Sequence, residues 1–159
     1  MRNSSRSSVD PFIVMDVMQA ANAAEAAGRH IIHMEVGQPG TGAPKGATEA
    51  LARAMEGGAL GYTVALGLPA LRARIAQMYG DWYNVDLDPD RVVITPGSSG
   101  GFILAFTALF DTGDRVAIGA PGYPSYRQIL KALDLTPVDL PTQATNRYQP
   151  VARDLVDQD

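Results

Sequence analysis

The stretch VVITPGSSGGFILAF, residues 92–106, places glycines and hydroxyl side chains between two apolar segments. Gly97, Ser98, Ser99 and Gly100 would lie where a strand turns into a helix. Backbone N–H groups at a helix start, together with the helix dipole, attract an anion, and the serine hydroxyls add further donors. The glycines let the backbone approach a ligand closely. The pattern predicts a phosphate-binding turn.

Two other interpretations of this turn stay open. Gly97, Ser99 and Gly101 also have the G-x-S-x-G spacing of a nucleophile elbow, but that chemistry needs a histidine after the serine, and both histidines precede it. The serines could instead only cap a helix that we expect to start near Phe102. A nucleotide site is not indicated, because neither the Walker A lysine nor the G-x-G-x-x-G spacing is present.

Hydrophobic patterning predicts an α/β fold around this turn. From about residue 91, strands and helices alternate, which builds a mostly parallel sheet covered by helices on both faces. Helices dominate the preceding ninety residues, and Asp10 is the expected N-cap of the first. The expected strands are 30–36, 91–95, 115–119 and 135–140, and the expected upstream helices are 11–28, 44–58 and 68–83.

Composition narrows the function to small-molecule chemistry. The 159 residues are 46% hydrophobic, with a net charge of −4, so no basic surface indicates a nucleic-acid or membrane partner. Cysteine is absent, which excludes disulfides and thiolate sites. His30 and His33 would point to opposite faces of a strand, so we expect no metal site. Without a leader or a long apolar span, we expect a soluble, cytoplasmic protein.

Three further motifs lie on either side of the turn TPGSSGG in the chain. They are EVGQPG at 35–40, GYTVALGLPALR at 61–72 and APGYPSY at 120–126. In this order and spacing the four motifs resemble the N-terminal portion of fold-type I pyridoxal-phosphate enzymes, specifically the class I/II aminotransferases related to aspartate aminotransferase. The resemblance begins near residue 12.

This resemblance implies a fold and its boundaries. Residues 1–45 would be an N-terminal helical arm with a first strand and loop. Residues 46–159 would be the first half of the mostly parallel, three-layer large domain that binds pyridoxal 5'-phosphate. We expect further sequence after Asp159, because a sheet with about three strands leaves its edges open.

The resemblance also implies site residues. The turn Gly97–Gly100, with Ser98 and Ser99 as donors, would bind the cofactor phosphate, and Tyr123 would stack on the pyridine ring. Tyr62 would reach across a homodimer interface to the partner's cofactor phosphate. Gly37 would lie beside the substrate carboxylate. From the residues alone, Tyr123 could equally be a core aromatic, Tyr62 an exposed loop residue and Gly37 a turn glycine.

Other residues of these motifs receive weaker assignments. Arg72 is expected to be a structural helix residue at the solvent edge rather than a substrate clamp. Gln38 and Leu66 could approach substrate, by position only.

No residue matches the family's catalytic lysine, which forms a Schiff base with the cofactor. The two lysines, Lys45 and Lys131, lie outside the family's lysine motif. The implied parent enzyme transfers an amino group between an amino acid and a 2-oxo acid, as in amino-acid biosynthesis, while the 159 residues alone would be inactive. The alternatives are an α/β-type serine hydrolase using Ser99, and an inactive interaction module.

Overall fold

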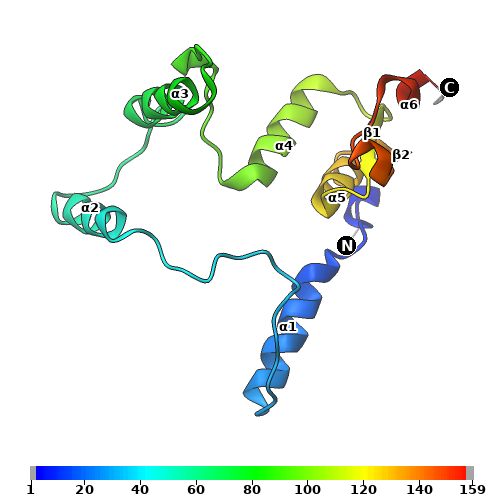
Figure 1. Ribbon diagram of the computed structural model, residues 1–159, viewed down its shortest axis with the longest axis horizontal. Helices are drawn as coiled ribbons and strands as arrows, with labels where there is room; N and C mark the ends of the chain where they lie inside the picture. Colours follow the sequence, from blue (N-terminus) through cyan, green and yellow to red (C-terminus); the bar gives the residue numbers. More distant parts are fainter. Residues whose placement is uncertain (1–2, 157–159) are drawn as a thin grey trace. The chain divides into compact units, whose positions relative to one another are not determined.

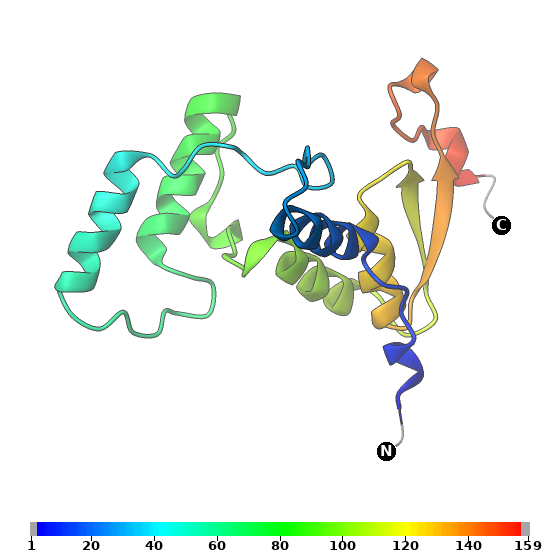
Figure 2. The ribbon, with the colours of Figure 1, turned by 90° about the horizontal axis from the view of Figure 1, so that it is seen from below.

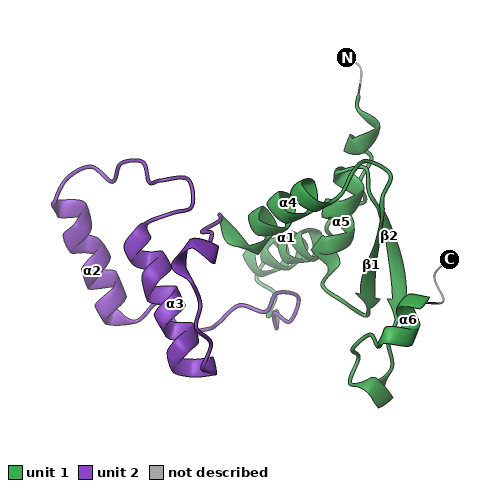
Figure 3. Cartoon of the chain, turned by 90° about the horizontal axis from the view of Figure 1, so that it is seen from above, with its two compact units in different colours: residues 1–31, 96–159 green, residues 32–95 purple. Residues whose placement is uncertain are grey.

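A computed structural model describes residues 3–156 of the chain. They form two compact units (Figure 3). Among these residues, the first unit comprises residues 3–31 and 96–156, and the second comprises residues 32–95. The elements of the first unit (Figure 1) are η1 Ser5–Ser7, α1 Ile13–Ala26, α4 Gly97–Leu109, β1 Arg115–Ala120, α5 Pro124–Ala132, β2 Thr136–Pro141, η3 Ala144–Asn146 and α6 Ala152–Val156.

The first unit contains a β–α–β crossover. Strands β1 and β2 are parallel, in a register that runs from Arg115 opposite Thr136 to Ala120 opposite Pro141, and α5 connects them (Figure 2). Helix α5 packs against β2 and against α4. Its Leu130 is fully buried, and Leu135 and Leu140 are also buried. This parallel unit confirms the α/β class, because parallel strands need such a crossover.

Two of the predicted strands are wrong. Neither 30–36 nor 91–95 is a strand among the described residues. Val92 has extended dihedral angles, φ −100° and ψ 122°, and the Ile94 N–H donates to the Leu66 carbonyl at 3.0 Å. An extended conformation becomes a strand only when a neighbouring strand forms a hydrogen-bonded ladder with it. The sheet of the described residues therefore has two strands where about three were expected.

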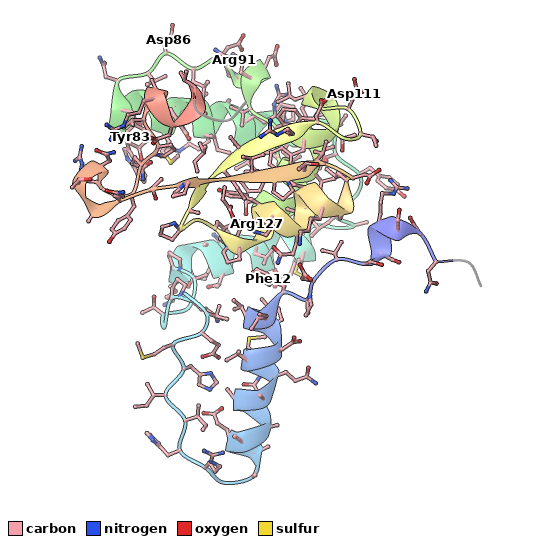
Figure 4. The ribbon with its side chains drawn as sticks, turned by 90° about the vertical axis from the view of Figure 1, so that its right-hand side faces the viewer. Phe12, Tyr83, Asp86, Arg91, Asp111 and Arg127 are labelled. Carbon is pink, nitrogen blue, oxygen red and sulfur yellow. The ribbon has the colours of Figure 1, made fainter. Side chains whose placement is uncertain are left out.

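The start of α1 also differs from the prediction. Its N-cap is Phe12, which makes no side-chain cap, so the expected cap by Asp10 is wrong. Instead, Lys131 Nζ donates to Asp10 Oδ2 at 2.6 Å, which attaches the N-terminal arm to α5. Figure 4 labels Phe12, the N-cap residue that precedes α1, and Arg127 on α5, whose guanidinium pairs with Asp139 of β2.

The second unit is helical. It contains α2 Lys45–Glu56, α3 Pro69–Tyr83 and η2 Pro89–Arg91. Pro69 occupies the first position of α3, where its missing N–H has no intrahelical partner to lose. Asn84 ends that helix in the left-handed conformation, φ 54°. Across residues 3–156, none of the helices has the length and apolar character needed to cross a membrane.

Candidate functional site

The glycine–serine turn forms the first turn of α4. The helix begins at Gly97, and its N-cap, Pro96, makes no side-chain hydrogen bond. Ser98 and Ser99 therefore lie inside the helix, and the expectation that they cap a helix starting near Phe102 is wrong. The first N–H groups of an α-helix have no intrahelical acceptor, so Ser98, Ser99 and Gly100 present backbone donors at the positive end of a helix of 13 residues.

The turn is open to a ligand. Ser98 and Ser99 are exposed. Gly97 has φ +73°, a conformation that favours glycine, and apart from its chain neighbours and the backbone of its own helix no atom lies within 4 Å of the position that a Cβ would occupy. The geometry is therefore that of an anion-binding helix start, with hydroxyl groups beside the backbone donors.

Tyr123, the expected ring-stacking residue, lies just beyond the carboxyl end of β1. It directly precedes α5 as its N-cap residue and is 48% exposed. Its ring centroid is 5.3 Å from that of Tyr126, which in turn is 4.6 Å from that of Phe102 on α4. Phe102 follows Ser99 by about one helical turn. A continuous line of aromatic rings thus connects Tyr123 with the helix that carries the serines.

These rings line a cavity of about 510 Å³ in the first unit. The aromatic wall is Phe102, Phe106, Tyr123, Tyr126 and Tyr148. Ser98 and Ser99 do not line this cavity, although they lie on the same helix, α4, as Phe102 and Phe106. Sequence analysis missed Tyr148, whose position depends on two consecutive non-glycine residues with positive φ, Arg147 at 52° and Tyr148 at 55°. No sequence pattern indicates that conformation.

The other two expected site residues belong to the second unit. Tyr62 is fully exposed, and Gly37 is exposed with no atom within 4 Å of a Cβ position. The structure thus brings Tyr123 and the turn Gly97–Gly100 into one compact unit, while Tyr62 and Gly37 lie in the other.

Arg72 is structural but not at the solvent edge. The residue is 7% exposed, and its guanidinium donates three hydrogen bonds to the segment around η2. The expectation of a solvent-edge position is therefore wrong. The patterning of α3 could not show this, because the acceptors follow 17 to 20 residues later in the chain.

The two lysines and Glu35 have partners of their own outside the turn. Lys45 Nζ lies 3.6 Å from Glu49 Oε1 on α2, and Lys131 pairs with Asp10. The hydrogen bond and charge of Lys131 lower the pKa of Asp10. Close to Gly37 in the chain, the imidazole of His33 lies 2.6 Å from Glu35, and this hydrogen bond is the main cause of a lowered pKa of Glu35.

Fold and site together define an α/β protein with an exposed glycine–serine helix start and, on the same helix, rings that belong to an aromatic cluster. Residues 29–158 match the family model for aminotransferase class I and II, and the chain belongs to this family. It is 47% identical over 154 residues to a valine–pyruvate aminotransferase of Mycobacterium tuberculosis. The crystal structure of an aminotransferase from the same organism superimposes on the whole chain with a TM-score of 0.94 and 46% identity. A solved protein of Silicibacter pomeroyi is 72% identical, with a TM-score of 0.87.

The chain spans about 40% of the length of the relatives it matches. It aligns over 97% of its own length with 40% of the Mycobacterium tuberculosis enzyme, and over all of its length with 40% of the Silicibacter pomeroyi protein. The resemblance to the N-terminal portion of class I/II aminotransferases is thereby confirmed, as is the expected fold within the large domain of a fold-type I enzyme.

Proposed function

We propose that this chain provides the phosphate anchor and the ring-stacking residue of a pyridoxal-phosphate-dependent aminotransferase. The enzyme would transfer an amino group between an amino acid and a 2-oxo acid, in the cytoplasm, as a homodimer. The observation that carries the proposal is the start of α4 inside the sequence TPGSSGG, with Ser98 and Ser99 exposed in its first turn. Family membership supports it independently.

The described residues fit the chemical groups of pyridoxal 5'-phosphate. A phosphate dianion needs several converging donors, and the first turn of α4 supplies backbone N–H groups and the hydroxyls of Ser98 and Ser99. Gly97 and Gly100 leave the approach to this turn unobstructed by side chains. When bound, the cofactor supplies an electron sink for the bonds at the substrate's Cα.

The remaining roles follow from position and exposure. Tyr123 would lie against the pyridine ring and exclude water from one of its faces. The hydroxyl of Tyr62, which is fully exposed, would donate to the phosphate bound by the partner subunit. Gly37 would lie beside the substrate carboxylate, where its backbone is open to approach. Residues 1–45 would act as the arm, and residues 46–159 as part of the cofactor domain.

The Schiff-base lysine would come from outside these residues. Lys45 pairs with Glu49 and Lys131 pairs with Asp10, and neither belongs to the turn or to the aromatic cavity. The 159 residues alone are therefore expected to bind the cofactor without a covalent bond.

The substrate proposal rests on the relatives. The Mycobacterium tuberculosis relative is a valine–pyruvate aminotransferase at 47% identity, whereas the aspartate aminotransferase of Pyrococcus horikoshii is 33% identical over 127 residues. We therefore infer valine and pyruvate as the first substrate pair to test.

The test uses the complete protein that contains these residues. Pyridoxal 5'-phosphate should produce an absorbance band near the edge of the visible range that borohydride abolishes. Amino transfer from valine to pyruvate should exceed transfer from aspartate. Absence of the band would refute the proposal, and labelling of Ser99 by a fluorophosphonate would favour the serine hydrolase instead.

A further inference from the structure

Arg72 binds the main chain of a segment later in the second unit. Its Nε donates to the carbonyl oxygen of Val92 at 2.9 Å, and its Nη2 donates to that of Pro89 at 2.8 Å. Nη2 also donates to Asp90 Oδ1 at 2.7 Å. Two of the three acceptors are backbone carbonyls, so the guanidinium fixes the path of residues 89–92 in addition to pairing with a carboxylate.

Gly67 makes the second contact with the same segment. Gly67 is buried and has φ +100°, and a Cβ added to it would lie 2.5 Å from Ile94 Cγ1 and 2.6 Å from Ile94 Cβ. No side chain fits there, because real Cβ atoms do not approach so closely. Beside this contact, the Ile94 N–H donates to the Leu66 carbonyl at 3.0 Å. The backbone of residues 66–67 is therefore packed directly on Ile94.

The contacts of Arg72 and Gly67 are close in the chain to two parts of the candidate site, Tyr62 and the glycine–serine turn. The Gly67 N–H donates to the Val64 carbonyl at 2.8 Å, which closes a turn at the end of the loop 61–67 that carries Tyr62. On the other side, Ile94 precedes Gly97, the first residue of α4, by three positions. The contacts of Arg72 and Gly67 thus join the base of the Tyr62 loop to the segment that enters the glycine–serine turn.

We propose that Arg72 and Gly67 form a positioning clamp, defined by their contacts with residues 89–94, that sets Tyr62 for its contact with the cofactor phosphate. This inference rests on the proposed function. Neither residue touches the phosphate in this scheme, because both are buried in contact with residues 89–94. Lysine cannot replace Arg72, since a single ammonium group cannot reproduce the planar arrangement of guanidinium donors.

The test combines Arg72→Lys with Tyr62→Phe in the complete protein. Arg72→Lys should raise the dissociation constant for pyridoxal 5'-phosphate about tenfold in the parent background, and less than about twofold when Tyr62 is phenylalanine. A purely structural role would give the same factor in both backgrounds. Arg74→Lys is the matched control, because Arg74 lies on the same helix with a side chain 65% exposed.

Hydrogen exchange of the Ile94 amide provides a readout that needs no cofactor. Arg72→Lys and Gly67→Ala should both accelerate it, whereas Gly42→Ala, where no atom lies within 4 Å of the Cβ position, should not. Gly67→Ala serves as the second variant if Arg72→Lys does not fold.

The outcomes separate this inference from the proposed function. If the parent protein does not bind pyridoxal 5'-phosphate, the proposed function fails. Independently of cofactor binding, unchanged exchange of the Ile94 amide in both Arg72→Lys and Gly67→Ala would overturn the clamp. If the cofactor binds but Arg72→Lys weakens binding equally in both Tyr62 backgrounds, the proposed function stands and the clamp is overturned. Non-additive binding with accelerated exchange supports it.

Discussion

The position of Ser98 and Ser99 relative to the first residue of α4 decides what their side chains can bind. A serine that precedes a helix satisfies the helix's own N–H groups. Because α4 already begins at Gly97, both serines lie within its first turn, and the N-cap residue, Pro96, makes no side-chain hydrogen bond. The backbone N–H groups and hydroxyls of Ser98 and Ser99 can therefore donate to a ligand, which is the physical basis of the proposed phosphate site.

Replacing Ser99 with alanine tests this site at a single atom. Ser99→Ala should raise the dissociation constant for pyridoxal 5'-phosphate by a factor of about 10 to 150, since a hydrogen bond to a charged group contributes about 1.5–3 kcal/mol. Fluorescence titration measures the change. Thr107→Ala, in the C-terminal half of α4, is the control and should bind as the parent does. Equal affinities of the Ser99→Ala variant and the parent would contradict the assignment.

For single residues, the sequence predicts roles within local motifs but not contacts between remote residues. The turn and Tyr123 could be selected from the sequence because their neighbours form recognisable motifs, and these roles stay predictions. The burial of Arg72 could not, because its acceptors at Pro89, Asp90 and Val92 are remote in sequence. The local pattern predicts a helix cap for Asp10, whereas its partner in the structure, Lys131, lies 121 residues later in the chain.

At the scale of elements, local sequence patterns predicted the helices correctly, but they also predicted two strands that the described residues do not form. The helices expected over 44–58 and 68–83 are α2 and α3, and the strands expected at 115–119 and 135–140 are β1 and β2. Helical hydrogen bonds are local, so periodicity and end signals suffice to find them. The strands expected at 30–36 and 91–95 needed a partner strand, which the described residues do not provide.

The contact between the N-terminal arm and α5 should depend on pH. Lys131 lowers the pKa of Asp10 in the folded chain, so this contact contributes stability above the ordinary carboxyl pKa of about 4. The contribution is lost as pH falls through the lowered pKa. Both side chains are partly exposed, so the effect should be small.

Hydrogen exchange, corrected for the intrinsic pH dependence, measures the pH effect. Exchange around residues 10–12 should accelerate below about pH 4 in the parent. Asp10→Asn should show the faster exchange already at neutral pH and little further change on acidification. Asp16→Asn, in the first turn of α1, is the control. A parent-like pH profile in Asp10→Asn would contradict the prediction.

The molecule as a whole exposes much apolar surface. The buried hydrophobic residues of the described chain are Ala76, Leu130, Leu135 and Leu140. On α4, Ile103 is 46% exposed, Leu104 is 57% exposed and Leu109 is 72% exposed. Large exposed apolar areas are uncommon on soluble monomers and indicate surfaces that associate. This is consistent with the proposed homodimer.

The 159 residues alone should therefore self-associate. Sedimentation velocity is expected to show mass increasing with concentration, and Leu104→Glu should shift the distribution towards the monomer because burying a carboxylate is costly. Gln77→Glu, which adds the same charge at an exposed position of α3, should have little effect. A concentration-independent monomer would contradict this prediction.

The ion pair between Asp10 and Lys131 has a consequence for biosynthesis. Its partners are separated by 121 residues. Ribosomes add about 5–20 residues per second, so roughly 6–24 seconds pass between the synthesis of Asp10 and that of Lys131. During that interval the arm has no α5 to dock on, and α1 must rely on its own alanine-rich turns. The contact between the arm and α5 can therefore form only after Lys131 has been synthesised.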